Sequence, residues 1–315
     1  MISRLFALYR RSPFWMRQII GKSTWPLALL MRPFREIRIS DYRMTLDFQD
    51  NASFKYWTDR DRYEKVEMSA FLEAVAANPD AQVIDVGANY GAFTLAVAAL
   101  YRRLGLTKSA PKIISIEPAQ RPNAALQRSI DRNGFAGAVD LHRAIVGDTE
   151  GEATLFENAR SSADNRTHSI VSAPIDVSRE SKVSCVTLDA ELRRAGLPPD
   201  AKLIVKMDIQ GNEFRAFRGM LTRLQSAGGY LVFFEHCPYL VESAGLKLDE
   251  LHDFLRSLAA PMMFEITPTG VVPLHGFDDF LRSVTRIHAE SLTTKMQGAG
   301  SNYIFCKAMS LTKAA

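Results

Sequence analysis

Cysteine is scarce in this chain. The 315 residues include three cysteines (Cys185, Cys237 and Cys306), which are scattered and lack the spacing of metal ligands. An odd number of isolated cysteines argues against a disulfide framework and against a structural zinc site, and it is typical of a reducing compartment. We therefore expect a cytoplasmic protein.

The first 36 residues lack a membrane-spanning run. They carry seven basic groups against one acid, a net charge of +6, mixed with Trp, Phe, Leu and Ile. No uncharged stretch in this arm approaches the roughly 18–20 residues that span a bilayer, and the arm lacks the apolar centre and cleavage site of a signal peptide. Two interpretations stay open. The arm packs on its own domain or on a partner subunit, or it lies on the anionic inner face of a membrane.

The rest of the chain, residues 37–315, has no excess of basic residues. Because the whole protein carries +4, residues 37–315 carry −2, and 47% of all residues are hydrophobic. This composition is typical of a globular protein with a sizeable core and disfavours nucleic acid as a partner.

From residue 81 onward, short apolar segments alternate with helical patterns. This alternation is typical of a mostly parallel sheet covered on both faces, so we predict an α/β fold with a doubly wound, seven-stranded, Rossmann-like sheet. Five strands are expected at 82–87, 112–117, 138–146, 202–208 and 229–235, with helices at 91–104, 122–133, 212–226 and 248–259.

Two further strands, 262–267 and 302–307, are predicted to form an antiparallel pair at a sheet edge near the C-terminus, since no crossover-length helix is apparent between them. Residues 37–60 are expected to form strands and turns, 62–77 a helix, and 147–181 irregular structure. The predicted domains are a basic arm (1–36), an extension (37–80) and a catalytic domain (81–315).

A glycine turn follows the first predicted strand. Its residues include Asp85, Gly87, Asn89, Tyr90 and Gly91. Glycine permits a positive φ and close approach of a ligand, and the helix that follows offers unpaired N–H groups. The spacing is not the G-x-G-x-x-G of pyrophosphate sites, and an aspartate suits an ammonium or sulfonium better. The alternative is a structural turn in which Asp85 caps the helix.

An acid also follows the second predicted strand, in the pair Glu117-Pro118. A carboxylate at this position can accept hydrogen bonds from both hydroxyls of a ribose. Together with the glycine turn, it predicts a nucleoside ligand.

These motifs resemble the FkbM-type family of class I S-adenosylmethionine-dependent methyltransferases. The shared segments, which span about residues 60–240, are D-V-G-A-N-x-G, I-E-P-x-x-x-P-N, A-I-V-G-D-x-x-G, V-T-L-D, K-M-D-I-Q-G-N-E and F-E-H. The resemblance implies S-adenosyl-L-methionine as the cofactor, with Asp85, Gly87, Asn89 and Gly91 around its methionine part, Glu117 on the ribose and Ala144 beside the adenine. Tyr90 and Pro118, inside the same motifs, complete the predicted cofactor-binding set.

The candidate catalytic residues follow the fourth and fifth predicted strands. They are Asp208, Glu235 and His236. Asp208 ends an apolar strand and is our first choice for contact with the acceptor or proton removal, although it could instead cap the next helix. His236 is an alternative base because its intrinsic pKa is near neutrality, or else a buried structural histidine. We predict no metal: the family often has Glu where this chain has Gln210, and nothing in the spacing requires a cation.

The resemblance implies an O-methyltransferase acting on a hydroxyl of a sugar, glycolipid or polyketide-like natural product. Two alternatives are a non-catalytic or partner-dependent protein that binds S-adenosylmethionine and a nicotinamide-dependent oxidoreductase, the latter disfavoured by Asp85 and the missing third glycine. The chain also lacks the N/D-P-P-Y/W segment of adenine-modifying enzymes. Neither the acceptor nor the oligomeric state follows from the sequence.

Overall fold

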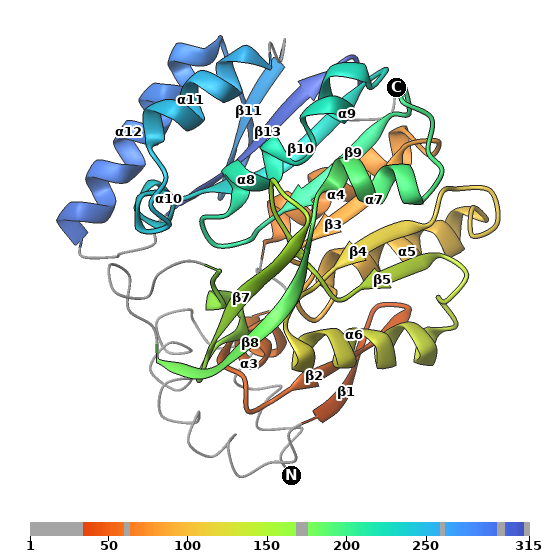
Figure 1. Cartoon of the computed structure of the whole chain (residues 1–315). Helices are drawn as coiled ribbons and strands as arrows, with labels where there is room; N and C mark the ends of the chain where they lie inside the picture. Colours follow the sequence, from red (N-terminus) through yellow and green to blue (C-terminus); the bar gives the residue numbers. More distant parts are fainter. Residues whose placement is uncertain (1–33, 60–63, 168–175, 259–261, 295–299, 312–315) are drawn as a thin grey trace.

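The centre of the computed structural model, which describes residues 34–59, 64–167, 176–258, 262–294 and 300–311, is an eight-stranded sheet (Figure 1). Its strand order is β12-β11-β13-β10-β9-β3-β4-β5. The parallel strands are β3 (Gln82–Val86), β4 (Ile113–Ile116), β5 (Val139–His142), β9 (Leu203–Met207) and β10 (Tyr230–His236). The antiparallel strands are β11 (Met262–Thr267), β12 (Gly270–Leu274) and β13 (Ser301–Lys307). The predicted α/β fold with a mostly parallel sheet is confirmed.

Helices cover both faces of this sheet because successive side chains of its central strands are buried on opposite sides. One face packs against α4 (Lys65–Ala77), α5 (Ala92–Leu104) and α6 (Gln120–Asn133). The other packs against α7 (Leu188–Arg194), α8 (Glu213–Arg218), α9 (Leu221–Ser226), α10 (Pro238–Ser243), α11 (Leu248–Ser257) and α12 (Phe277–Thr294). Side chains of adjacent strand residues therefore enter different layers.

The C-terminal edge of the sheet differs from the prediction. Strands β11 and β13 pair antiparallel as expected, but the 18-residue α12 lies between them in sequence. The additional strand β12 pairs with β11 and forms the edge, so the sheet has eight strands instead of seven. The predicted single helix at 212–226 is two helices, α8 and α9, interrupted at Gly219 and Met220.

The N-terminal extension packs against the α5–α6 side. Strands β1 (Phe34–Ile39) and β2 (Tyr42–Asp47) form a hairpin, and Met44 and Leu46 of β2 join the core of that layer. The expected turns after β2 were partly wrong, since Asn51–Asp59 is a helix, α3. Of the predicted arm, residues 1–33 lie outside the described residues.

A second sheet lies where we predicted irregular structure. It contains β6 (Ile145–Val146), β7 (Gly151–Asn158) and β8 (Val177–Val186) in the order β6-β8-β7. The predicted strand 138–146 is accordingly two strands in two sheets. The β7–β8 pair reaches toward α3 (Figure 1), where the Asn51 N–H donates to the Arg160 carbonyl at 2.8 Å. Within the part of the chain that the structure describes, no helix is long and apolar enough to cross a membrane.

Candidate active site

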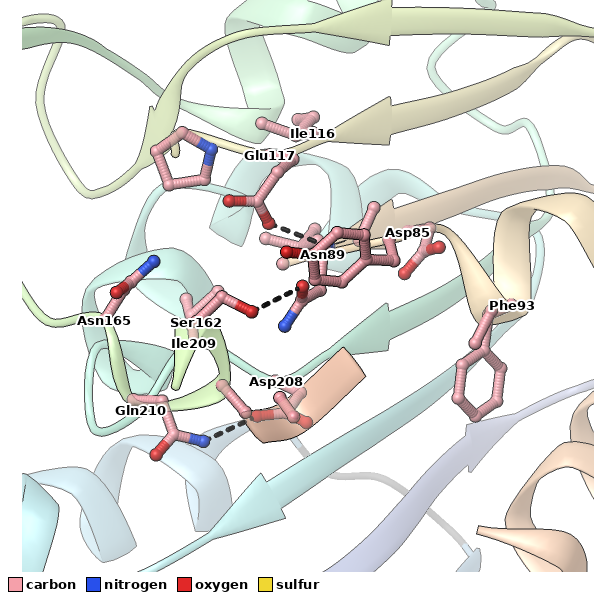
Figure 2. Close-up of a pocket in the computed structure, with 18 of the residues that line it drawn as sticks. Asp85, Asn89, Phe93, Ile116, Glu117, Ser162, Asn165, Asp208, Ile209 and Gln210 are labelled. Carbon is pink, nitrogen blue, oxygen red and sulfur yellow. Dashed lines mark hydrogen bonds between the residues drawn. The ribbon is translucent and has the colours of Figure 1, made fainter. Parts of the chain in front are cut away.

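A pocket that is partly open to solvent lies at the carboxyl ends of β3, β4 and β9 (Figure 2). Its walls come from the turns that follow these strands, from β6, from α3 and from the loop at 162–167. The carboxyl edge is where doubly wound sheets bind ligands.

The turn after β3 requires glycine at two positions. Gly87 has a φ of +81°, and a Cβ there would lie 2.1 Å from the carbonyl oxygen of Asp208. Gly91 has a φ of +84°, and its Cβ would lie 2.2 Å from Leu126 Cδ1. Gly87 lines the pocket, whereas Gly91 is the N-cap of α5 and is not among the lining residues. Close approach of neighbouring chain segments thus accounts for both glycines.

Asp85 lines the pocket and also caps α5. Its Oδ2 accepts hydrogen bonds from the Thr94 N–H at 3.0 Å and from the Thr94 hydroxyl. The side chain is 3% exposed, and burial raises the pKa of Asp85. Asp85 therefore caps helix α5, as one of the two interpretations of the sequence predicted. It also lies at the wall of the pocket.

Glu117 is a second buried acid of the pocket lining, 6% exposed. Its Oε2 accepts the Asn89 N–H and its Oε1 accepts the Ala119 N–H, each at 2.8 Å. Burial raises the pKa of Glu117 to about 7, although these two N–H groups oppose the shift. The carboxylate is held in one orientation, and each oxygen has a further lone pair.

The other predicted cofactor residues, apart from Gly91, also line the pocket. Asn89 has a φ of +50°, and its Oδ1 accepts the Ser162 hydroxyl at 3.0 Å (Figure 2). The Tyr90 hydroxyl donates to Asp50 Oδ2 at 2.9 Å. Pro118 and Ala144 line the pocket as well.

Asp208 lines the opposite side of the pocket, next to Gln210 (Figure 2). The Gln210 Nε2 donates to Asp208 Oδ1 at 3.0 Å and to Glu235 Oε2 at 3.1 Å. Glu235 is half-buried behind this amide and is not among the lining residues. Asp208 and Glu235 are thus brought together by Gln210, with Asp208 nearer the ligand space.

His236 does not reach the pocket. It is 2% exposed and points into the α11–α12 layer, where its Nε2 lies 3.2 Å from the Nε2 of His252 and its ring stacks on Phe280. Burial, with His252 and His288 nearby, lowers the pKa of His236 to about 3. We do not retain His236 as a candidate base, because the strand directs Glu235 and His236 to opposite faces.

Sequence reasoning missed four residues that build this site. Asp50 and Ser162 hold the glycine turn, and Glu67 and Lys206 form a buried ion pair next to Asp208. Only Lys206 had a local signal, a lysine inside an apolar strand. Within the described ranges, no group of three or more His, Cys, Asp or Glu side chains is arranged to hold a metal ion.

Comparison with known proteins gives one family match and several solved structures. Residues 85–260 match the family model of the methyltransferase FkbM domain. No curated protein matches the sequence.

Three solved structures illustrate the structural similarity. A methyltransferase FkbM from Methylobacillus flagellatus matches 72% of this chain at 15% identity and a TM-score of 0.38, and the match spans 44% of that protein. A SAM-dependent methyltransferase from Agrobacterium tumefaciens matches 72% at 9% identity and a TM-score of 0.39, spanning 58% of its length. An O-methyltransferase from a trans-AT PKS multienzyme of Brevibacillus brevis, in complex with S-adenosyl-L-homocysteine, matches 80% at 11% identity and a TM-score of 0.40, spanning 75%.

Proposed function

Because this chain belongs to the FkbM family of methyltransferases, we propose that it transfers a methyl group from S-adenosylmethionine to a hydroxyl oxygen. The acceptor that we propose is a sugar, a glycolipid or a polyketide-like natural product. The observation that supports the cofactor best is the placement of Glu117 at the carboxyl edge of the sheet.

The residues of the pocket fit this cofactor. Glu117 is oriented by the N–H groups of Asn89 and Ala119 and can accept both ribose hydroxyls with its remaining lone pairs. Gly87 lines the pocket, and its missing side chain lets the Asp208 backbone pack directly against the turn after β3. The acids of the lining, Glu64, Asp85, Glu117 and Asp208, outnumber its one lysine, Lys206, and this excess favours a ligand that carries a sulfonium.

When bound, S-adenosylmethionine supplies an electrophilic methyl group on a sulfonium. The protein then has two tasks, to align the acceptor oxygen and to remove its proton. Alignment alone can contribute several kcal/mol, and a positioned base adds about 10²–10⁴-fold. We assign proton removal to Asp208, and this assignment is supported by its position in the pocket lining and by the Gln210 amide that donates to its carboxylate.

Calorimetric titration with S-adenosylhomocysteine tests the cofactor assignment. Replacing Glu117 with alanine removes two charge-assisted hydrogen bonds to the ribose, and we expect roughly 10–100-fold weaker binding. Glu242→Gln, an exposed substitution on α10, is the matched control and should bind like the wild type. Unchanged affinity in Glu117→Ala would remove the basis of the proposal.

The same titration should depend on pH. Since the pKa of Glu117 is about 7, the free carboxyl is largely protonated at pH 6 and largely ionised at pH 8. Only the ionised form accepts from both hydroxyls, so affinity should rise between these pH values. In Glu117→Gln, the affinity for S-adenosylhomocysteine should change less between these two pH values than it does in the wild type.

Two other functions predict different results. A nicotinamide-dependent oxidoreductase would be stabilised against heat by NAD and not by S-adenosylhomocysteine. A non-catalytic binding protein would bind S-adenosylhomocysteine but transfer no tritiated methyl group to candidate hydroxyl acceptors. Our proposal requires both binding and transfer.

We propose the cytoplasm as the location, with residues 1–36 either packed against protein or in contact with the inner membrane face. Fractionation of cells that express the full chain and a form beginning at residue 34 would distinguish these two roles. Membrane contact requires that only the full chain sediments with membranes.

A further inference from the structure

One hydroxyl of the pocket lining lacks the hydrogen bond that a buried polar group needs. Ser53, in the first turn of α3, is 1% exposed and is among the residues that line the pocket. Among the residues that the structure describes, its Oγ has no hydrogen-bond partner. Buried polar groups in native proteins are nearly always hydrogen-bonded, because an unpaired one costs free energy. An unpaired hydroxyl in the wall of a pocket therefore points to a ligand that completes its bonding.

The start of α3 is fixed beside the turn after β3. The Asp50 carboxylate accepts the Tyr90 hydroxyl and the Ala52 N–H, each at 2.9 Å, and the Asp50 carbonyl accepts the Phe54 N–H at 2.9 Å. The protein itself thus caps the first turn of α3. The group that this turn offers to a ligand is therefore the Ser53 hydroxyl, and not the helix N-terminus.

Proton donors are scarcer than acceptors in the pocket lining. Its acids outnumber its one lysine, and the ammonium of that residue, Lys206, lies 3.3 Å from Glu67 Oε1 and 3.7 Å from Asp208 Oδ2. The Gln210 amide donates to Asp208 and to Glu235. Since these donors already serve acids of the protein, an anionic group of a ligand must find its donor elsewhere.

The proposed cofactor carries such an anionic group. Next to its sulfonium, S-adenosylmethionine has an amino-acid end with an ammonium and a carboxylate. The acids of the lining suit the sulfonium and the ammonium, whereas the carboxylate needs a donor. A hydroxyl can supply one, and a hydrogen bond to an ionised acceptor is stronger than one between neutral groups.

We infer that Ser53 donates its hydroxyl proton in a hydrogen bond to the carboxylate of the amino-acid end of S-adenosylmethionine. The inference rests on the proposed function and adds a residue that determines specificity, because Ser53 distinguishes ligands with this carboxylate from ligands without it. The carboxylate then lies against α3 and the ribose against Glu117, which follows β4. Two separate segments of the chain hold the two parts of the cofactor.

The Ser53 hydroxyl should be dispensable for folding. Since no described residue pairs with it, Ser53→Ala should leave the urea midpoint of the ligand-free full chain unchanged or higher. Ser129→Ala is the matched control. Ser129 on α6 is 0% exposed, and its hydroxyl accepts the Thr45 N–H and donates to the Ala125 carbonyl, each at 2.9 Å.

Ser129→Ala leaves the Thr45 N–H unpaired and should lower the urea midpoint. If Ser53→Ala lowered it as much, Ser53 would have a partner within the protein, and the inference would be overturned.

Calorimetric titration with two ligands locates the contact. The ligands are S-adenosylhomocysteine and its decarboxylated analogue, whose amino-acid end is a plain aminopropyl group. We expect Ser53→Ala to bind S-adenosylhomocysteine roughly 10–100-fold more weakly than the wild type, since a hydrogen bond to a charged group is lost. It should bind the decarboxylated analogue as the wild type does. Ser129→Ala should bind both ligands like the wild type.

The remaining outcomes contradict the inference. Unchanged affinity of Ser53→Ala for S-adenosylhomocysteine would mean that the hydroxyl does not contact the cofactor. Equal weakening for both ligands would place the hydroxyl on another part of the cofactor. Both results leave the cofactor assignment intact, whereas a wild type that binds neither ligand would remove the proposed function and this inference together.

Discussion

Gly87 is the position where the site tolerates a side chain least. Its φ is +81°, and the Asp208 carbonyl oxygen lies 2.1 Å from the point that a Cβ would occupy. Gly134 at the end of α6 is a matched control, since its φ is +67° but nothing lies within 4 Å of the corresponding point. We expect Gly134→Ala to cost about 1–2 kcal/mol for the left-handed backbone alone.

Gly87→Ala should cost about 1–3 kcal/mol more than Gly134→Ala, because the steric clash adds to the backbone term. It should also weaken S-adenosylhomocysteine binding, since relief of the clash must displace the β3 or β9 turn. Urea unfolding and calorimetry measure the two effects. Equal losses of stability in the two variants would show that the close approach is unimportant.

At the residue scale, the alternation of side chains along a strand explains why Glu235 lies near the pocket and His236 does not. Glu235 and His236 are adjacent in β10, so they had to point to opposite faces of the sheet. The sequence could therefore have excluded one of them as a pocket residue. It could not have identified Glu67 as the partner of Lys206, because that contact joins α4 to β9 across more than a hundred residues.

At the scale of elements, Asp50 connects three segments around the turn after β3. Its carboxylate accepts the Ala52 N–H at the start of α3, the Tyr90 hydroxyl and the Ser162 N–H, at 2.9, 2.9 and 3.2 Å. Ser162 in turn donates to Asn89. Helix α3, the turn after β3 and the loop after β7 are thus held by one side chain.

Asp50→Ala should cost roughly 2–3 kcal/mol, because a helix cap and two tertiary hydrogen bonds disappear together. Tyr90→Phe removes one of these bonds and should cost about 1 kcal/mol. Asp253→Ala, at an exposed site on α11, should change stability by less than about 0.5 kcal/mol. Urea denaturation measures the stability of the three variants. If Tyr90→Phe lost as much stability as Asp50→Ala, the idea that Asp50 holds all three segments would be wrong.

Elements with both faces buried were predictable, and elements with one polar face were not. Strands β3, β9 and β10 are short apolar runs, and their predicted bounds differ from the observed ones by no more than one residue at either end. Strand β8 is mostly polar and half-exposed, so its composition resembles that of a loop. Helix α12 did carry a signal that went unused, since Phe280, Val284 and Ile287 recur at helical spacing and are buried.

For the whole molecule, the buried acids set the pH dependence of stability. Glu117 and Glu213 are 6% and 3% exposed, and burial raises the pKa of each to about 7. Between about pH 4.5 and 7 the folded state holds protons that the unfolded chain releases, so stability falls as pH rises through this window and then levels off. His236 acts in the opposite direction, because its folded pKa of about 3 makes stability fall as pH drops below about 6.5.

We expect the double variant Glu117→Gln with Glu213→Gln to lose part of the decline between pH 4.5 and 7, because Glu67, Asp85 and Glu235 also have raised pKa values and remain. One pKa unit corresponds to about 1.4 kcal/mol, so each of the two replaced acids contributes at most roughly 3.5 kcal/mol to the decline. Gln lowers the starting stability as well, because Glu213 accepts the N–H groups of Ile209 and Gly211. The test is therefore the slope of unfolding free energy against pH from urea denaturation at several pH values, and parallel curves for variant and wild type would mean that these two acids are ionised in the folded protein throughout.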